Sequence, residues 1–268
     1  MKHAAATTLI GVAWIACAAP ALPGPVEDAR ALYKLGDYPK AFALYRPLAD
    51  AGDADAQLIV GRMFHDGQGV ARNNAEAYAW VRKAADQGNA EAEDYLGFLF
   101  ANGQGVPEDK TAAFNWIRKA AEQGYAKAEF DLGIAYVDGK GTKQDEVVAV
   151  TWFRKAADRG NADAQFWLGL SYDQAAGVAQ EYIAAVSWYR KSADQGNAMA
   201  QYALGLMYYK GHGVAQDLFE AYKWCAVSST RESDLRSDAI AMREDIASHL
   251  TATQISDAQK WVRAWRPK

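Results

Sequence analysis

The chain is predicted to be all-α, a right-handed α-α superhelix (solenoid) of stacked helical hairpins. A 36-residue period runs through most of its 268 residues, and such a period is typical of solenoid repeats. Within each period, apolar residues recur at helical spacing in two separate stretches, as expected for a hairpin of two helices. Half of the residues are hydrophobic and 23% are charged, which is the composition of a chain that folds.

The charge of the chain argues against one large class of function. Lysine and arginine together number 29, against 33 aspartate and glutamate residues, so the formal net charge is −4. The sequence also lacks a long basic run. Proteins that bind nucleic acid through phosphate contacts carry basic patches, so we expect no nucleic-acid partner.

Tryptophan and glycine reveal the period most clearly. Tryptophans lie 36 residues apart at Trp80, Trp116, Trp152, Trp188 and Trp224. Glycines follow the same step at Gly61, Gly97, Gly133, Gly169 and Gly205. Two series that stay in phase over five units indicate structural repeats, and we interpret both as positions that hold the repeats together.

Residues 88–123 illustrate one unit. A first helix is expected from Ala90 to about Ala101, with Gly97 in its interior. Glycine inside a helix costs about 1 kcal/mol relative to alanine, so its recurrence indicates that a neighbouring helix approaches closely. A glycine-rich turn follows, and Asp109 is expected to cap the second helix by accepting hydrogen bonds from its free N–H groups.

The second helix of each unit carries a tryptophan among alanines. In residues 88–123, Trp116 is flanked by Ala113, Ala120 and Ala121, and we interpret the indole as a knob and these alanines as its socket. Truncating a buried aromatic residue typically costs about 3–5 kcal/mol, so these rings are expected to contribute strongly to stability. One hairpin cannot cover its own apolar faces, whereas stacked hairpins cover one another, which predicts a solenoid.

This pattern resembles the Sel-one-like repeat, a relative of the tetratricopeptide repeat with a longer loop inside each unit. The shared motif is A-x-A-x-x-x-L-G-x-x-Y-x-x-G-x-G-V-x-x-D-x-x-x-A-x-x-W-x-x-K-A-A-x-x-G. The resemblance implies five repeats in residues 52–230, namely 52–87, 88–123, 124–159, 160–195 and 196–230. Two departures stand out: Ala175 replaces a loop glycine, which predicts a strained or differently shaped turn, and Thr142 replaces a loop valine.

Shorter segments flank the repeats. Residues 22–51 resemble a tetratricopeptide hairpin without the loop insertion, and we interpret them as an N-terminal cap. Residues 231–268 are interpreted as C-terminal capping helices, one over Glu232–His249 and a last one that Thr251 could cap. Both ends of a solenoid need such covers.

Residues 1–21 are predicted to be a secretory signal peptide. A short basic start precedes an uncharged run that is short for a membrane span, and residues 19–21 (Ala-Pro-Ala) offer a small-x-small cleavage pattern. An uncleaved anchor is one alternative. A lipoprotein signal at Cys17 is another, although Trp14 is bulky where such signals usually carry leucine. We therefore expect a periplasmic or secreted protein with no integral membrane segment after cleavage.

The sequence provides no combination of residues that predicts catalysis. The histidines beyond the signal peptide, His65, His212 and His249, lie in different units without metal-ligand spacing. Cys225 follows a tryptophan of the series and is interpreted as a small buried residue. The G-x-S-x-G nucleophile elbow is missing from the sequence. We expect no catalytic residues, no metal and no cofactor.

The resemblance also brings one enzymatic precedent. Some cysteine-rich exported members of the repeat family have been described as β-lactamases or penicillin binders. Those proteins carry a cysteine pair in each unit, which this chain lacks, and the sequence contains no S-x-x-K motif. A β-lactamase-like hydrolase is therefore the least favoured of the alternatives.

By analogy with tetratricopeptide stacks, the first helices are expected to line an inner groove. The candidate partner-binding residues, chosen by helical register, are Phe130, Ile134, Val137, Phe166, Leu170, Tyr202, Leu206 and Tyr209. An exposed apolar stripe of this kind marks a partner site. The alternative, which the sequence leaves open, is that these side chains pack between helices.

These observations lead to a hypothesis about function. We expect an exported, non-catalytic scaffold that mediates protein–protein interaction by binding another envelope protein, through an amphipathic helix or an apolar peptide that fits the groove. The alternative is a module that binds peptidoglycan or another glycan through aromatic and carboxylate side chains.

Overall fold

The computed structural model describes residues 24–268, in which all regular secondary structure is helical. The predicted signal peptide, residues 1–21 with Cys17, lies outside the described residues. None of the helices in the described part is long and apolar enough to cross a bilayer. The helices are α1 (Pro25–Lys34), α2 (Tyr38–Asp50), α3 (Ala54–Asp66), α4 (Asn74–Asp86), α5 (Ala90–Ala101), α6 (Lys110–Glu122), α7 (Ala126–Asp138), α8 (Glu146–Asp158), α9 (Ala162–Gln174), α10 (Tyr182–Asp194), α11 (Ala198–Lys210), α12 (Leu218–Ser229), α13 (Arg236–Ala247) and α14 (Ala252–Ala264).

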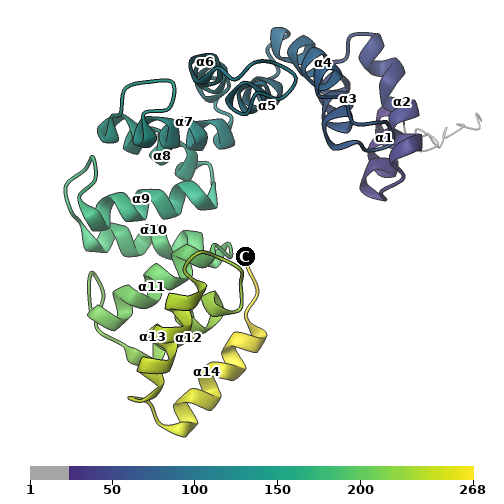
Figure 1. Ribbon diagram of the computed structural model, residues 1–268. Helices are drawn as coiled ribbons and strands as arrows, with labels where there is room; N and C mark the ends of the chain where they lie inside the picture. The colour runs from purple at the N-terminus through teal and green to yellow at the C-terminus, as the bar shows by residue number, and fades with distance from the viewer. Residues whose placement is uncertain (1–23) are drawn as a thin grey trace, which may run out of the picture.

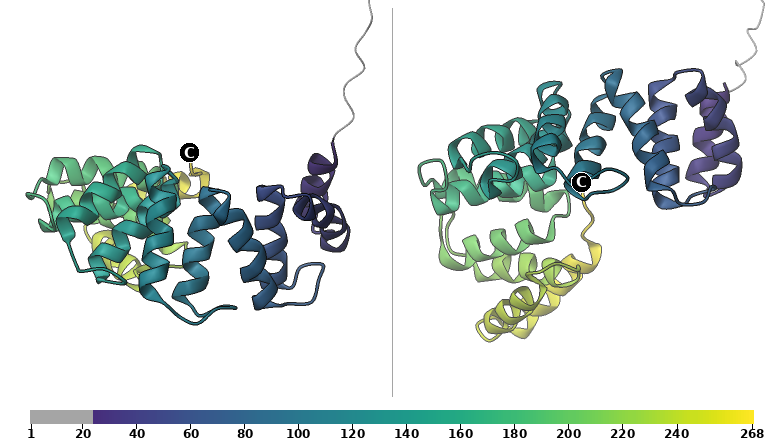
Figure 2. Two further views of the ribbon diagram at one scale, coloured as in Figure 1. Left: turned by 90° about the horizontal axis from the view of Figure 1, so that it is seen from above. Right: turned by 45° about the horizontal axis from the view of Figure 1, so that its top comes forward.

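The helices follow one another along an arc (Figure 1). Extensive contacts join helices that are neighbours in the chain from α1 to α13, and α12 also packs against α14. The further views in Figure 2 show the same row of hairpins from other sides. Each hairpin is therefore covered by the next one, and the predicted solenoid of stacked helical hairpins is confirmed.

The helix limits follow the local sequence. α5 begins at Ala90 and ends at Ala101, as predicted. Asp109 caps α6 by accepting hydrogen bonds from the N–H groups of Thr111 and Ala112, both at 2.9 Å. These bonds satisfy two of the backbone donors that the first turn of a helix leaves free.

Gly97 lies where the two helices of its hairpin, α5 and α6, approach closely. A Cβ atom at this position would lie 2.6 Å from Cγ1 of Ile117 and 3.1 Å from the carbonyl oxygen of Ala113. At Gly133, one unit later, the ring of Phe153 occupies the corresponding space. The close helix approach that the recurring glycine predicts is confirmed.

The turn after α9 is strained, as the sequence predicts. Ala175 has a φ angle of 59°, and among residues 24–268 it is the one non-glycine residue with a positive φ. Glycine holds the equivalent position at the ends of α3, α7 and α11. A Cβ atom in this left-handed region costs about 1–2 kcal/mol because it crowds the following carbonyl oxygen.

The tryptophan series packs between the second helices of successive hairpins. Trp116 lies against a cluster that contains Ala84 and Ala85 of α4. Ala120, on the same helix as Trp116, packs instead with Trp152 of the next unit. The socket of each indole is therefore supplied by the preceding unit, which corrects the interpretation that alanines of the same helix form it.

A lysine covers each of the first four indoles. Its Nζ atom lies 3.7–4.0 Å from the centroid of the ring three residues earlier, and the lysines are Lys83, Lys119, Lys155 and Lys191. Such cation–π contacts contribute about 0.5–1 kcal/mol at exposed sites. Trp80 and Trp224 are buried and the other three rings are half-buried, so the W-x-x-K part of the motif stabilises the second helix of each of these hairpins.

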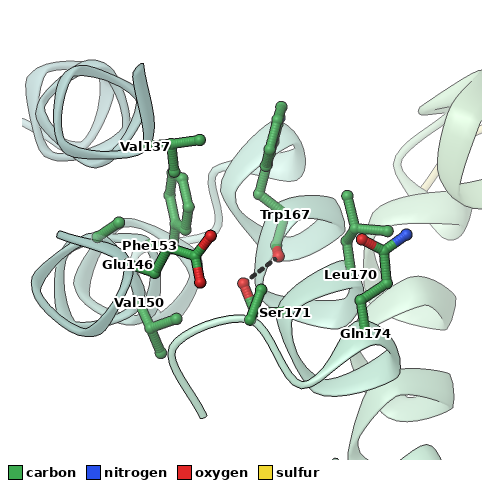
Figure 3. A pocket seen from close by; sticks show the side chains of 10 residues that line it. Val137, Glu146, Val150, Phe153, Trp167, Leu170, Ser171 and Gln174 are labelled. Atoms are coloured by element: carbon green, nitrogen blue, oxygen red, sulfur yellow. Dashed lines mark hydrogen bonds between the residues drawn. The ribbon is translucent and has the colours of Figure 1, made fainter. Parts of the chain in front are cut away.

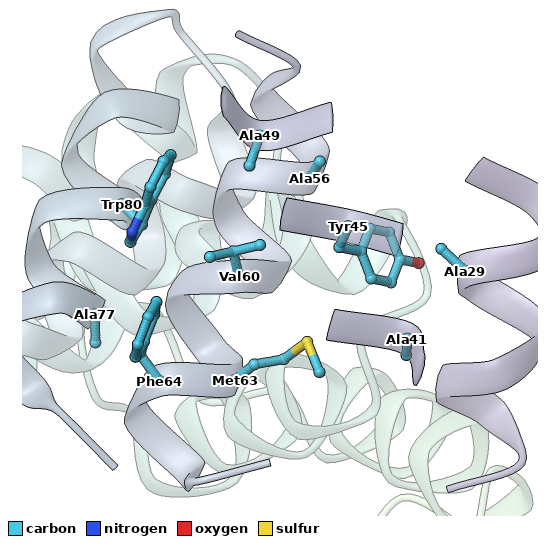
Figure 4. Packing of buried hydrophobic residues seen from close by; sticks show 10 residues of the cluster. All are labelled: Ala29, Ala41, Tyr45, Ala49, Ala56, Val60, Met63, Phe64, Ala77 and Trp80. Atoms are coloured by element: carbon cyan, nitrogen blue, oxygen red, sulfur yellow. The ribbon is translucent and has the colours of Figure 1, made fainter. Parts of the chain in front are cut away.

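The N-terminal end of the stack is closed by α1 and α2. Tyr45 of α2 belongs to a buried cluster with Val60 and Met63 of α3 (Figure 4). The same cluster extends to Trp80 of α4. The segment interpreted as a cap thus shares one core with the first full hairpin.

The C-terminal end is closed by aromatic rings. The Trp224 ring of α12 lies 5.4 Å from that of Trp261 and 6.4 Å from that of Trp265, measured between ring centroids. Thr251 caps α14 through a capping box with Gln254. The helix expected over residues 232–249 is shorter at both ends, because α13 is preceded by a turn and followed by the Thr251 cap.

Candidate binding cavities between the hairpins

The predicted groove residues are less exposed than a free apolar stripe would be. Phe166 is buried, with 7% of its surface exposed. The other seven are half-buried, namely Phe130, Ile134, Val137, Leu170, Tyr202, Leu206 and Tyr209. These eight side chains fall into three groups that pack against different neighbours.

The phenylalanines pack onto the second helix of their own hairpin. The Phe130 ring centroid lies 5.9 Å from that of Phe153, and the Phe166 centroid lies 5.8 Å from that of Tyr189. Packing between helices, the alternative that the sequence leaves open, therefore describes the position of both phenylalanines.

The last three residues of the set lie on α11, beside the C-terminal cap. Tyr202 and Tyr209 pack against the cluster formed around α12 and α13. The Tyr209 hydroxyl also donates a hydrogen bond to Oδ2 of Asp245, at 3.1 Å. Leu206 is half-buried on the same helix. These side chains therefore lie next to the C-terminal helices.

The remaining three residues, Ile134, Val137 and Leu170, line cavities between consecutive hairpins. The α7–α9 cavity has a volume of about 140 Å³ and lies between the end of α7, the start of α8 and the end of α9 (Figure 3). Its lining consists of Val137, Glu146, Ala149, Val150, Phe153, Trp167, Leu170, Ser171, Gln174 and Ala176. Most of these side chains are apolar, so the cavity suits an apolar group.

The α5–α7 cavity lies one hairpin earlier and has a volume of about 320 Å³. Its lining consists of Ala101, Asn102, Lys110, Ala113, Phe114, Ile117, Asp131, Ile134, Ala135 and Lys140. When each number is raised by 36, every position except that of Asn102 coincides with a lining position of the α7–α9 cavity. The two cavities are therefore the same space in consecutive repeats.

At the preceding junction, between α3, α4 and α5, side chains meet across the equivalent space. His65 and Gln104 occupy positions that line the two cavities in later units, and here His65 Nε2 is in hydrogen-bond contact with Gln104 Oε1. The rings of Tyr95 and Phe98 stack beside them, with centroids 5.5 Å apart. We call this junction closed because its opposite sides touch.

The junction between α9, α10 and α11 is closed by a different pair. The Tyr182 ring stacks on His212, with centroids 4.5 Å apart, and both residues again occupy cavity-lining positions. Nearby, the Tyr189 hydroxyl donates a hydrogen bond to Oδ2 of Asp173 at 3.3 Å. Two open junctions in the middle of the array are thus flanked by two closed ones.

An ion pair between a buried aspartate, Asp94, and an exposed lysine, Lys127, joins α5 to α7 across the first open junction. Lys127 Nζ lies 2.8 Å from Oδ2 of Asp94 and 2.6 Å from Oδ2 of Asp131. Burial raises the pKa of Asp94 to about 6, although the lysine opposes this shift. Oδ1 of Asp94 finds no hydrogen-bond partner within residues 24–268. The equivalent positions of other units hold Leu58, Phe130, Phe166 and Tyr202.

A series of buried polar side chains, which we call the ladder, recurs once in each repeat, and we did not predict it. Its members recur every 36 residues as Gln57, Glu93, Glu129, Gln165 and Gln201. The first four bond to side chains 30 residues later, at 2.6–3.2 Å: Gln87, Gln123, Arg159 and Gln195. Its signal in the sequence is the recurrence of glutamine or glutamate after A-x-A. These bonds tie the start of each unit to its end, and three of the glutamines, Gln57, Gln165 and Gln201, also donate to a carbonyl oxygen of the preceding unit, at 3.1 Å. These bonds explain why a polar residue is tolerated there.

Cys225 and the histidine and carboxylate side chains of the described residues offer no alternative site. Burial raises the pKa of the Cys225 thiol to about 12, so the thiolate that a nucleophile requires does not form near neutral pH. In the part of the chain that the structure describes, no three histidine, cysteine, aspartate or glutamate side chains gather as a metal site would require. The two apolar cavities are therefore the strongest candidate for a functional site.

The comparisons with known proteins agree with this architecture. The Sel1 repeat family model matches residues 31–53, 54–89, 90–125, 126–161, 162–197 and 198–227. The chain belongs to the Sel1 repeat family. This is the Sel-one-like repeat that the sequence resembles. The first match, at residues 31–53, covers part of the segment that we interpret as an N-terminal cap. Sel1 repeat proteins typically mediate protein–protein interactions and are generally non-catalytic.

Two solved structures are similar to this Sel1 repeat protein. One is a protective antigen of uropathogenic Escherichia coli strains with an SLR fold, at 34% identity and a TM-score of 0.81, over 90% of this chain and 52% of that chain. The other is a Sel1 repeat protein from Oxalobacter formigenes, at 34% identity and a TM-score of 0.71, over 78% of this chain and 86% of that one. This chain thus spans about half the length of the antigen. A search of curated proteins gives no match.

Proposed function

We propose that this protein is an exported, non-catalytic scaffold that binds a protein partner in the bacterial cell envelope. The observation that carries the proposal is the pair of equivalent apolar cavities, of about 140 and 320 Å³, in consecutive repeats. Sites that recur at the repeat step suit an elongated partner that lies along several units. A small-molecule site would need one cavity with convergent polar groups.

The surroundings of the cavities support binding rather than catalysis. Glu146 and Ser171 are polar residues of the α7–α9 lining, and the Ser171 hydroxyl donates its hydrogen bond to the carbonyl oxygen of Trp167, at 2.9 Å. A serine nucleophile needs a neighbouring base, whereas this hydroxyl is bonded to its own helix. Incubation with a chromogenic β-lactam tests whether the protein is a hydrolase, and hydrolysis would contradict the non-catalytic part of the proposal.

The glycan-binding alternative would require aromatic faces that are free to stack on sugar rings. In the predicted groove, the Phe130 and Phe166 rings lie instead against Phe153 and Tyr189. Cosedimentation with purified peptidoglycan distinguishes the alternatives. Pelleting with the glycan would favour that alternative, and a protein that stays in the supernatant would favour a protein partner.

Affinity capture from envelope extracts tests partner binding. We expect capture by the unmodified protein and its loss in an Ile134→Ser and Leu170→Ser double variant, which makes one wall of each cavity polar. Leu35→Ser is the matched control, because Leu35 is 81% exposed on a distant hairpin. Capture that survives the double variant, with unchanged helicity, would contradict the proposal. Replacing Phe166 would be a poorer test, since that ring is part of the core.

Export is proposed on the signal-peptide pattern of residues 1–21. Fractionation of a Gram-negative host followed by N-terminal sequencing tests it. We expect a periplasmic protein whose first residue is Leu22. A cytoplasmic protein that retains Met1 would contradict the proposal, and a lipid-modified Cys17 would favour the lipoprotein alternative.

A further inference from the structure

We infer that the two open cavities together hold one extended segment of a partner protein, with a bulky apolar side chain in each. In this partner segment, an acidic residue lies next to the side chain that enters the α5–α7 cavity. A basic residue lies next to the side chain that enters the α7–α9 cavity. The inference rests on the proposed function and specifies the chemistry of the partner.

The size of the cavities supports two separate anchors. A cavity of about 150 Å³ lined by apolar side chains is large enough to bind benzene. The α7–α9 cavity has about that volume and the α5–α7 cavity about twice as much. Packed helices lie about 8–10 Å apart, so equivalent points of adjacent hairpins are separated by roughly 10–18 Å. An extended chain covers this distance in about three to five residues.

The rim of the α5–α7 cavity is basic. Lys110 and Lys140 both line it, and their side chains are 61% and 66% exposed. Each contacts an acid two residues away in the chain, but exposed ion pairs of this kind contribute little and can be exchanged for a partner's carboxylate. Asp131 also lines this cavity, and its carboxylate is already bound by Lys127, at 2.6 Å. The charged side chains that line this cavity are therefore two exposed lysines and one carboxylate that is already paired, so the rim is predominantly positive.

The rim of the α7–α9 cavity has the opposite charge. Glu146 takes the position of Lys110, and Ala176 takes that of Lys140. Within residues 24–268, Glu146 has no ion-pair partner. A partner segment with opposite charges beside its two anchors would match both rims.

The same rim positions distinguish the open junctions from the closed junction after α9. At the closed junction after α9, Tyr182 and His212 occupy the positions of Lys110 and Lys140 and stack on each other. Two lysines repel each other, and glutamate beside alanine has nothing to stack on, so neither pair forms the stacked contact that closes the junction after α9. Because closed junctions flank the open ones, the partner segment is limited to two anchors.

Synthetic peptides test the inference by fluorescence anisotropy. The mixed-charge probes are Glu-Leu-spacer-Leu-Lys and the reverse order Lys-Leu-spacer-Leu-Glu, with spacers of three, four or five Gly and Ser residues. The comparison probes carry two glutamates or two lysines instead. We expect at least one mixed-charge probe to bind at least fivefold more tightly than every like-charged probe. Replacing both leucines with serine should abolish binding.

Two protein variants make the test specific to the cavities. Glu146→Lys makes both rims basic, so the preference should shift from mixed-charge to all-acidic probes by at least fivefold. Glu146→Tyr combined with Ala176→His transfers the pair that closes the junction after α9, and should weaken binding of the mixed-charge probe at least tenfold. The chain already accommodates that pair at the equivalent position, so the variant is expected to fold, with unchanged helicity.

Several results would overturn the inference. They are the absence of binding by every probe at 1 mM, equal affinity for mixed and like-charged probes, and unchanged affinity after Glu146→Tyr with Ala176→His. If probes fail while envelope capture still depends on Ile134 and Leu170, the inference fails and the proposed function stands. If probes bind as expected and envelope capture fails, the cavity chemistry stands and the proposed envelope partner falls.

Discussion

The open and closed junctions of this solenoid differ far less in backbone than in side chains. Both kinds are built from hairpins with the same glycine series, the same tryptophan series and nearly the same helix lengths. At the closed junction after α9, Tyr182 stacks on His212. At the open junction after α7, the same two positions hold Glu146 and Ala176. The difference shows how a repeat protein can have a cavity at one junction and not at the next without altering its fold.

The comparison also separates two roles within one repeat. Gly97 and Trp116 belong to series that recur in five units, and they fix how helices meet. Positions such as 110 and 140 vary from unit to unit and line the cavities of the open junctions. The residues that hold the helices together and the residues that line the cavities are therefore different residues of the same hairpin.

The largest expected effect comes from breaking the hairpin that both junction types share. Gly97→Leu places a side chain where Ile117 and the Ala113 carbonyl oxygen leave no room. Overpacking of a core typically costs about 1–3 kcal/mol, and because backbone lies on one side here we expect about 3 kcal/mol in the free energy of unfolding. Urea denaturation followed by circular dichroism measures it. Ala79→Leu, on the exposed face of α4, should change stability by less than about 0.5 kcal/mol.

A smaller, pH-dependent effect concerns the ion pair across the first open junction. The folded state raises the pKa of Asp94 from 3.8 to about 6, so the protonated form is favoured. Its stabilising contribution is complete below pH 3.8 and is lost as pH rises through about 6. Asp94→Asn should therefore be more stable than the unmodified protein at pH 7.5, by about 1–2 kcal/mol, and nearly equal to it at pH 4.

Thermal denaturation at the two pH values provides the measurement. Asp131→Asn is the control, because Asp131 is partly exposed and bonds to the same lysine. A difference between Asp94→Asn and the unmodified protein that stays constant from pH 4 to 7.5 would contradict this explanation.

Opening a closed junction should lower the free energy of unfolding by about 1 kcal/mol. Tyr182→Ala with His212→Ala removes the stacked pair, and aromatic pairs contribute about 0.5–1.5 kcal/mol beyond their buried area. The variant should lose about that much stability and gain affinity for apolar peptides at the new cavity. Denaturation and peptide anisotropy measure the two effects. Unchanged stability would mean that the stack does not hold the junction closed.

The smallest expected effect concerns the strained turn beside the second open junction. Ala175→Gly relieves the positive φ of 59° and should raise the free energy of unfolding by about 0.5–1 kcal/mol. Differential scanning calorimetry would detect the higher Tm. Ala176→Gly, at the next residue, serves as a control and should not stabilise the protein. A Tm that falls for Ala175→Gly would show that the turn is not strained.

The sequence predicted the features that depend on local patterns. The limits of α5, the Asp109 cap and the close approach at Gly97 all follow from helical periodicity, capping chemistry and the missing Cβ atom. The strain at Ala175 follows in the same way, because only the comparison with glycine at equivalent positions is needed.

The features that sequence reasoning missed depend on contacts between units. The pair His65 and Gln104 joins residues 39 apart, and the stacking of Tyr182 on His212 depends on where a loop places its side chain. Helical register placed Phe166 on the inner face, but it could not show that the ring leans onto Tyr189. Only Ile134, Val137 and Leu170 of the predicted groove line a cavity, because the neighbouring hairpin determines which positions are covered.

Methyl NMR during titration with a mixed-charge peptide tests most directly whether the open junctions bind the partner. Ile134 and Leu170 occupy equivalent positions at the two open junctions, and Leu206 occupies that position at the closed junction after α9. We predict that the methyl signals of Ile134 and Leu170 shift together and saturably, while those of Leu206 stay in place. Shifts at Leu206 of equal size, or no shift at Ile134 and Leu170, would contradict the assignment of the open junctions as the binding site.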